Sequence, residues 1–413
     1  MIRGKIAKML CGQKRQISFH TPGHKKRGAD ITELSYSDNL FSPHGVIKAA
    51  QEEIAERLGA YRTFFLTDGS TAGVHAMLFA LKERGITRIA LSPYSHPSVT
   101  GGCKLLGIEC VFISVPLKEG IPLQPVPSET EKALRNADAL LLTSPDYYGF
   151  LPDLAFARDL TAREKKPLAI DGAHGSHFHF DRIRYAGRYA DMWVDGAHKS
   201  LPALTQGAAV SARSGEWADA LEEGVRLFHT TSPSYPILAS VEEAFLYPRK
   251  PETERAAEEF KKNIGAVGND DWTKVLIRYG KNADAVERFL ESRGVYPEFN
   301  DGNYILFYLS PCTKKGELRK LAGLLKKCPA PESWEGEVLA AKVSNAQCGA
   351  IEYIPLKEAV GRLCAADAGI FPPSLPVIRK GERISTETVC RLENAVHAFG
   401  LKDGKIAVYT EKE

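Results

Sequence analysis

Short, uniformly apolar runs separated by segments of helical length are the feature that most constrains how this chain can fold. A run that is apolar at every position, without alternation, is typical of a strand buried on both faces of a sheet. Between the runs, residues 70–85 carry apolar side chains at the spacing of one helical face, at Val74, Met77, Leu78 and Leu81. The alternation of strand and helix predicts an α/β fold, with a mostly parallel central sheet flanked by helices. The runs occupy residues 87–92, 108–114, 137–144, 167–173, 191–197 and 207–212.

The pattern changes after about residue 250 and predicts a smaller α+β domain. Charged amphipathic segments at 252–267, 283–294 and 315–328 read as helices, and the apolar stretch 302–310 reads as a strand. A chain of 413 residues is long enough for one large and one smaller domain. We expect residues 1–265 to form an N-terminal segment with the large domain, and residues 266–413 to form the smaller C-terminal domain.

The composition favours a small-molecule ligand over nucleic acid or a membrane. The formal charge of +3 is spread along the chain and leaves no basic tract. No apolar run reaches the ~20 residues needed to cross a bilayer, and residues 1–16 lack the apolar core of a signal peptide. These features predict a soluble cytoplasmic protein.

The cysteines are scattered and contain no CxxC pair, which disfavours a metal or disulfide framework in a chain of this length. We expect reduced thiols that lie mostly in the core. They are Cys11, Cys103, Cys110, Cys312, Cys328, Cys348, Cys364 and Cys390.

The stretch "FLTDGSTAGVHAML" predicts a strand that runs into a helix through Gly69, Ser70 and Thr71. Unpaired backbone N–H groups, the positive end of the helix and two hydroxyl groups would converge there, which suits a phosphate. An ordinary helix cap is the alternative interpretation.

In "LAIDGAHGSHFHF", Asp171 stands at the carboxyl end of an apolar strand, where ligand-facing residues of open α/β sheets usually lie. The spacing of His174, His177 and His179 matches no common metal site, so we expect no metal.

Lys199 follows another apolar strand. If it projects into the same crevice as Asp171 and Ser70, the site holds an amine, a carboxylate and a phosphate cradle, the protein groups that pyridoxal phosphate requires. His96 follows the strand at 87–92 and could lie flat over a ring there. The alternatives are a surface loop lysine and a turn histidine that caps neighbouring backbone.

The chain resembles the Orn/Lys/Arg decarboxylase family, pyridoxal phosphate enzymes with the type I, aspartate aminotransferase-like fold. The matching stretches follow the family order over nearly the whole length. They are "FHTPGHKKRGAD", "DNLFSPHGVIKAAQEEIAERLGAYRTFFLTDGSTAG", "SPDYYGFLPDL", "IDGAHGSHFHF", "DGAHKSLPALTQGA", "HTTSPSYPILAS" and "IPLKEAVGRLCAADAGIFPPSLPVIRKGERI".

The resemblance implies roles for particular residues. Lys199 would form the Schiff base with the cofactor, next to His198, which is one candidate for the acid that protonates the α-carbon. Asp171 would pair with the ring nitrogen, and His96 would stack on the ring. Ser232 would lie near the active site of a facing subunit, since family sites are built at a dimer interface. The remaining cofactor-binding candidates are Gly69, Ser70, Thr71, Ala173 and His174.

This chain departs from the family pattern close to these residues. Asp195, Gly196 and Ala197 stand where the family carries a phosphate-binding hydroxyl residue before the His-Lys pair, so one phosphate contact is expected to be lost. Gly172 replaces a common acidic residue, and Asp68 and His75 replace common asparagines. The chain is also short for the family, without the N-terminal wing domain of the large decarboxylases, so we expect a homodimer and no decamer.

The resemblance implies decarboxylation of arginine, lysine or ornithine to an amine for polyamine metabolism. Two other readings stay open: an aminotransferase or aldolase that uses the same cofactor, and a catalytically inactive family member that acts as a binding partner.

Overall fold

The computed structural model describes residues 3–12, 17–25, 29–340, 350–370, 375–395 and 397–410. The chain divides into two compact units. The first consists of residues 1–113, 124–254 and 309–313, and the second of residues 114–123, 255–308 and 314–413. The boundary expected near residue 265 therefore falls inside the second unit, which also takes a short segment from early in the chain. Cys348 and part of the "GIFPPSLP" stretch lie outside the described residues.

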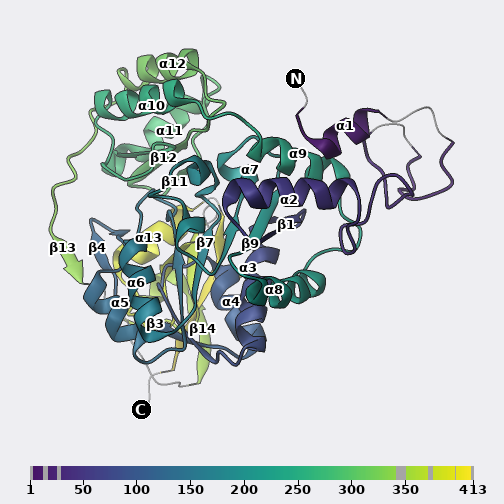
Figure 1. Cartoon of the computed structure of the whole chain (residues 1–413). Helices are drawn as coiled ribbons and strands as arrows, with labels where there is room; N and C mark the ends of the chain where they lie inside the picture. The colour runs from purple at the N-terminus through teal and green to yellow at the C-terminus, as the bar shows by residue number, and fades with distance from the viewer. Residues whose placement is uncertain are drawn as a thin grey trace. The chain divides into compact units, whose positions relative to one another are not determined.

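A seven-stranded sheet forms the centre of the first unit, in the order β1-β9-β8-β7-β6-β2-β3 (Figure 1). Neighbouring strands from β8 to β3 run parallel, and β9 runs antiparallel to both β8 and β1. The prediction of a mostly parallel sheet is confirmed. The edge strand β3 is only partly buried, because nothing pairs with its outer side in the sheet. The bounds are β1 Arg62–Leu66, β2 Arg88–Leu91, β3 Glu109–Phe112, β6 Ala139–Thr143, β7 Leu168–Gly172, β8 Met192–Asp195 and β9 Ala208–Ala212.

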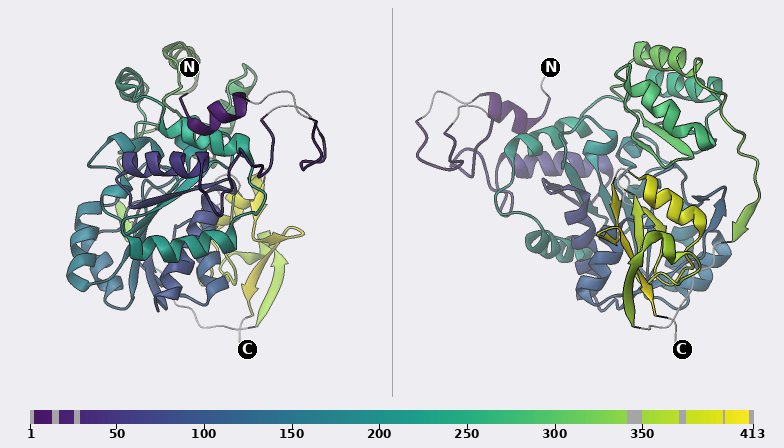
Figure 2. Two further views of the ribbon diagram at one scale, coloured as in Figure 1. Left: turned by 45° about the vertical axis from the view of Figure 1, so that its right-hand side comes forward. Right: turned by 180° about the vertical axis from the view of Figure 1, so that it is seen from behind.

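Helices connect these strands and flank the sheet. Helices α3, α4 and α8 pack together, and α1, α2 and α9 form a second group (Figures 1 and 2). The helices of this unit are α1 Lys5–Cys11, α2 Val46–Leu58, α3 Gly69–Glu83, α4 Pro97–Leu106, α5 Pro127–Leu134, α6 Leu154–Glu164, α7 Ala197–Ser200, α8 Gly215–Phe228 and α9 Tyr235–Phe245. Helix α10, Pro251–Asn263, begins in the first unit and lies mostly in the second. Two 3₁₀ turns, η1 Ser176–Phe180 and η2 Ala186–Arg188, follow β7.

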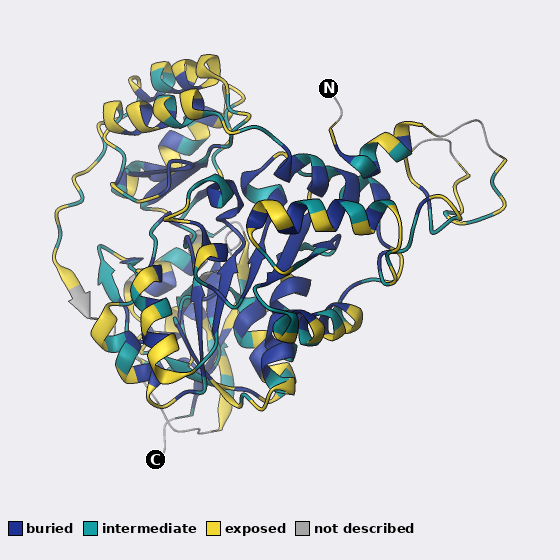
Figure 3. Cartoon of the chain, viewed as in Figure 1, coloured by how far each residue is buried: buried dark blue, intermediate teal, exposed yellow. Residues whose placement is uncertain are grey.

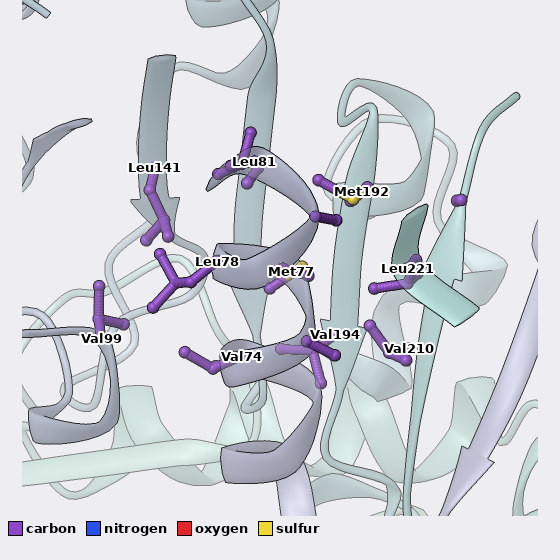
Figure 4. Close-up of a cluster of buried hydrophobic side chains, with 14 of the residues drawn as sticks. Val74, Met77, Leu78, Leu81, Val99, Leu141, Met192, Val194, Val210 and Leu221 are labelled. Atoms are coloured by element: carbon purple, nitrogen blue, oxygen red, sulfur yellow. The ribbon is translucent and has the colours of Figure 1, made fainter. Parts of the chain in front are cut away.

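The core of the first unit lies between the sheet and helices α3, α4 and α8. The predicted apolar face of α3 is buried here: its four side chains meet Val99 of α4, Val194 of β8 and Leu221 of α8 in one cluster (Figure 4). Figure 3 shows the same division, with buried strands at the centre and exposed residues on the outer faces of the helices. This packing holds the carboxyl ends of the parallel strands in fixed positions.

In the part of the second unit that the structure describes there are four small antiparallel sheets, in agreement with the expected α+β character. Their strands are β10 Lys274–Arg278, β12 Tyr304–Tyr308 and β11 Phe299–Asn300; β13 Val338–Ala340, β4 Pro116–Lys118 and β5 Ile121–Pro122; β14 Ile351–Pro355, β19 Lys405–Tyr409 and β18 Leu401–Lys402; and β16 Leu375–Ile378, β15 Ala368–Ile370 and β17 Ala398–Phe399. Its helices are α11 Ala283–Glu291, α12 Lys315–Leu325 and α13 Thr386–Asn394, with 3₁₀ turns η3 Gly280–Asn282 and η4 Leu356–Ala359.

The expectation that the cysteines lie mostly in the core is wrong. Among those in the described residues only Cys103 and Cys364 are buried, whereas Cys11, Cys312 and Cys390 are exposed. Scattered cysteines therefore say little about burial here, since a helix or loop can present a small thiol on its outer side. No helix within the described ranges is long and apolar enough to cross a bilayer.

Candidate active site

Asp171 and Lys199 come from the ends of two neighbouring strands. Asp171 belongs to β7 and is 3% exposed, and its Oδ1 accepts a hydrogen bond from the Ala173 backbone N–H at 3.1 Å. Lys199 lies in the short helix α7 directly after β8, and its Nζ is 3.2 Å from Nε2 of buried His174. Because β7 and β8 are parallel neighbours, both side chains emerge at the same edge of the sheet.

His96 joins this group from β2. It is the N-cap residue of α4, and its Nδ1 accepts the Ser98 backbone N–H at 3.1 Å. Burial lowers the pKa of His96; the charge of Asp171 opposes that shift, and the charges of Lys199 and His75 add to it. The interpretation of His96 as a residue that caps neighbouring backbone is thus correct. The same side chain also interacts electrostatically with Asp171 and Lys199.

The N-terminus of α3 has no side-chain cap. Its N-cap residue, Asp68, makes no cap hydrogen bond with its side chain, whereas Asp153 and Ser214 cap α6 and α8. The Asp68 carboxylate instead accepts the Thr230 backbone N–H at 2.7 Å. Ser70, one residue inside α3, is buried, and its Oγ has no hydrogen-bond partner within the described structure. A buried donor without a partner at a helix N-terminus suits a phosphate oxygen.

Gly196, two residues before His198, lies unusually close to the backbone of a neighbouring loop. A Cβ built on Gly196 would lie 2.4 Å from the Ala173 carbonyl oxygen and 2.9 Å from Ser70 Oγ. The N-cap position of α7 therefore lies close both to Ala173, two residues after Asp171, and to the orphaned Ser70 hydroxyl. A side chain at this position would force the neighbouring backbone to shift.

The donor set fits pyridoxal phosphate. An amine, a carboxylate, an imidazole and an unsatisfied hydroxyl at a helix N-terminus converge here, and they match the aldehyde, ring nitrogen, ring face and phosphate of that cofactor.

Comparisons with known proteins agree with this geometry. Residues 27–270 match the family model described as Orn/Lys/Arg decarboxylase, major domain. The chain belongs to the Orn/Lys/Arg decarboxylase family. It is 29% identical to the uncharacterised protein YaaO of Bacillus subtilis over 97% of both chains, and 28% identical to an arginine decarboxylase of the same organism over 91% of this chain and 90% of the relative.

Solved structures of low sequence identity share the fold. The constitutive lysine decarboxylase of Escherichia coli matches 99% of this chain and 82% of its own, with a TM-score of 0.76 and 18% identity. The Francisella novicida lysine decarboxylase matches 98% of this chain and 80% of its own, with a TM-score of 0.77 and 18% identity. The chain is thus a pyridoxal phosphate-dependent amino acid decarboxylase with the type I fold.

The remaining residues implied by the family differ in their burial and in their hydrogen-bond partners. His198 is half-buried beside Lys199, and its Nδ1 donates to the Gly207 carbonyl at 2.9 Å. Gly69 adopts φ +74° and donates its N–H to Gln206. Thr71 and Ser232 are both exposed. The Ser232 backbone N–H donates to Thr230 Oγ1 at 3.1 Å.

Asp195 is a departure from the family pattern that turns away from the cofactor-binding group. It is 1% exposed, and its Oδ2 accepts hydrogen bonds from Tyr185 Oη at 2.8 Å and Trp193 Nε1 at 3.0 Å. Burial raises its pKa to about 7, although the bonds from Tyr185, Trp193 and Ser176 oppose that shift.

Sequence reasoning missed Tyr147 and Ser98. The Tyr147 ring packs edge-on against His174, with ring centroids 5.3 Å apart. Ser98 holds His96, as described above. A sequence signal existed for Tyr147, since it follows β6 at the same edge of the sheet. His174 contacts Lys199, and His179 contacts the Ser176 carbonyl. Within the described residues, no group of three or more histidine, cysteine or acidic side chains could hold a metal ion.

Proposed function

We propose that this enzyme decarboxylates a basic amino acid, arginine, lysine or ornithine, at the Lys199 site, and that the amine product enters polyamine metabolism. The observation that carries the assignment of the site is the convergence of Lys199, Asp171 and His96 beside the orphaned Ser70 hydroxyl. The relatives named arginine decarboxylase make arginine the first substrate to test.

The chain's own residues have separate tasks. Lys199 would bind pyridoxal phosphate covalently, Ser70 and the N-terminus of α3 would bind its phosphate, and Asp171 would keep the ring nitrogen protonated. When bound, the cofactor acts as an electron sink for the bond to the carboxylate. Ala173, packed between Asp171 and Gly196, would line the ring pocket.

His198 is the proposed acid for the α-carbon. Since its Nδ1–H is donated to Gly207, Nε2 is the atom that remains to carry and release a proton. Burial lowers the pKa of His198, and the charge of Lys199 lowers it further. A lowered pKa leaves His198 mostly without a proton on Nε2 at neutral pH, so the residue must take up a proton there before it can deliver one to the α-carbon.

We further propose a cytoplasmic homodimer in which Ser232 serves the facing subunit. The exposure of the Ser232 side chain supports this assignment, since an exposed residue is accessible to a second copy.

The test is to incubate the purified chain and pyridoxal phosphate with each basic amino acid and to measure carbon dioxide. We expect yellow protein, release from at least one substrate, and loss of both colour and activity in Lys199→Ala. The control is Lys104→Ala, which removes an exposed lysine of α4. Yellow protein that releases no carbon dioxide from all three substrates would refute the proposed reaction.

Amine analysis separates decarboxylation from transamination, because only decarboxylation yields agmatine or a diamine. Light scattering tests the dimer, and a monomer that is fully active would contradict the proposed role of Ser232.

A further inference from the structure

Helix α4 begins at a hydrogen-bonded group that links His96 to α3. The Nδ1 of His96 lies 3.1 Å from the Ser98 backbone N and 2.8 Å from Ser98 Oγ. The Ser98 carbonyl oxygen lies 3.1 Å from Nε2 of His75, which belongs to α3. Ser98 is 9% exposed, so these bonds are shielded from water.

The direction of each bond follows from the groups involved. A backbone N–H can only donate, so Nδ1 of His96 must present its lone pair to Ser98. A neutral imidazole carries one proton, which therefore lies on Nε2 of His96. A backbone carbonyl can only accept, so His75 must donate from its own Nε2.

We infer that Ser98 and His75 are positioning residues that hold His96 as the neutral Nε2–H tautomer. His96 therefore offers the cofactor or substrate a hydrogen-bond donor at Nε2 and no acceptor. The inference deepens the proposed function and rests on it for the identity of the reacting groups, but the tautomer itself does not depend on activity.

The packing of α4 on α3 supports the role of His75. The His75 ring stands edge-on to Phe228 of α8, with centroids 5.5 Å apart. A Cβ on Gly102 would lie 2.6 Å from Leu78 Cδ1 and 2.9 Å from His75 Cδ2, so the two helices meet at this glycine. The hydrogen bond from His75 thereby holds the Ser98 carbonyl, and the first turn of α4 with it, in a fixed position against α3.

Charges around His96 favour the same state. The groups that act on it are Asp171 from β7, Lys199 from α7 and His75 from α3. Burial is the largest cause of its lowered pKa, and only Asp171 acts in the opposite direction. Protonation of Nδ1 would also remove the lone pair that accepts the Ser98 N–H, so acid would release the cap.

The experiment is nitrogen-detected NMR of histidine-labelled holoenzyme and apoenzyme, with the His96 signals assigned by His96→Gln. At pH 7.5 we expect Nδ1 without a proton and Nε2 with one. In Ser98→Ala, which retains the backbone donor but loses the hydroxyl, the protonation midpoint of His96 should rise by about 0.5 pH unit. The acid limb of the kcat/KM profile should move with it.

His75→Phe retains a ring against Phe228 but removes the donor to Ser98. We expect a mixture of His96 tautomers and a lower kcat, with unchanged cofactor binding. Gly101→Ala is the control, since a Cβ there meets nothing within 4 Å and the variant should behave as wild type. Nδ1–H as the main form in the wild type would overturn the inference, as would an unchanged midpoint in Ser98→Ala together with a single tautomer in His75→Phe. An intact Nε2–H tautomer in protein that releases no carbon dioxide would instead refute the proposed function alone.

Discussion

Asp171 and Asp195 are two buried aspartates on neighbouring parallel strands, and they face opposite sides of the sheet. The register pairs Asp171 with Val194 and Gly172 with Asp195. Paired residues of adjacent strands share a face, and successive residues alternate between faces. Val194 faces α3, because a Cβ on Gly73 would lie 2.7 Å from its Cγ2. Asp171 therefore shares the α3 side, and Asp195 shares the opposite side with Trp193.

This difference of one residue in register separates two chemical environments. Asp171 lies beside His96 and Lys199, whereas Asp195 lies in a closed pocket with Tyr185 and Trp193. An acid at the end of an apolar strand is thus not enough to mark a catalytic residue. The face of the sheet on which the carboxylate lies determines which groups surround it.

Asparagine substitutions at Asp171 and Asp195 should show the largest difference between the two faces of the sheet. Asp171→Asn keeps the shape and can still accept the Ala173 N–H, but it loses the charge opposite the ring nitrogen. We expect kcat to fall at least about 100-fold, the usual cost of removing one preorganised electrostatic partner. Asp195→Asn should keep most of its activity, because its carboxylate faces away from the site. Steady-state carbon dioxide release measures both.

Thermal unfolding of the apo forms is the control for that pair. Asp171→Asn should melt close to wild type, so that its loss of activity is not a loss of fold. Equal activity losses in the two variants would show that the faces have been assigned wrongly.

Gly196→Ala tests the close approach of the backbone after Asp195 to the backbone after Asp171, and it should have the next largest effect. Its Cβ would lie 2.4 Å from the Ala173 carbonyl, so the α7 turn must shift. We expect a loss of about 1–3 kcal/mol in unfolding free energy, as for other overpacked sites, and weaker cofactor binding. Urea unfolding and cofactor titration measure the two effects. Gly101→Ala, at an unobstructed helical position, should lose neither, and a fully stable Gly196→Ala that binds cofactor normally would contradict the close approach.

The sequence was sufficient for the strands and for the buried face of α3, because these depend on local apolar patterns, and the roles predicted around Lys199 stay predictions. It was insufficient for Asp195. The departure "DGAHK" predicts a lost phosphate contact, which stays a prediction; it did not predict that Asp195 bonds to Tyr185 and Trp193 or that Gly196 lies close to the Ala173 carbonyl. Such facts depend on register and on backbone approach between residues distant in sequence, as does the contact of Ser98 with His75.

The pH dependence of stability should distinguish the two aspartates further. Burial raises the pKa of Asp195 to about 7 from an ordinary value of 3.8. Between these values the folded state binds one more proton than the unfolded state, so stability falls as pH rises through this window. One such group contributes at most about 1.4 kcal/mol per pH unit. Urea unfolding at pH 5, 6 and 7 should show this slope as the difference between wild type and Asp195→Asn, and identical slopes would contradict the raised pKa.

Tyr185→Phe should give the smallest effect, confined to the Asp195 side. The variant removes one of the two donors to Asp195 Oδ2 and leaves Trp193 Nε1 in place. Because the ionised carboxylate loses more than the protonated form, the pKa of Asp195 should rise further. The unfolding free energy at pH 8 should fall by about 1 kcal/mol, and by less at pH 5. Tyr189→Phe is the matched control, since that hydroxyl donates to the Ile183 carbonyl and not to Asp195. Equal losses of unfolding free energy at pH 5 and pH 8 in Tyr185→Phe would mean that the Tyr185 hydroxyl stabilises the fold through packing and does not affect the pKa of Asp195.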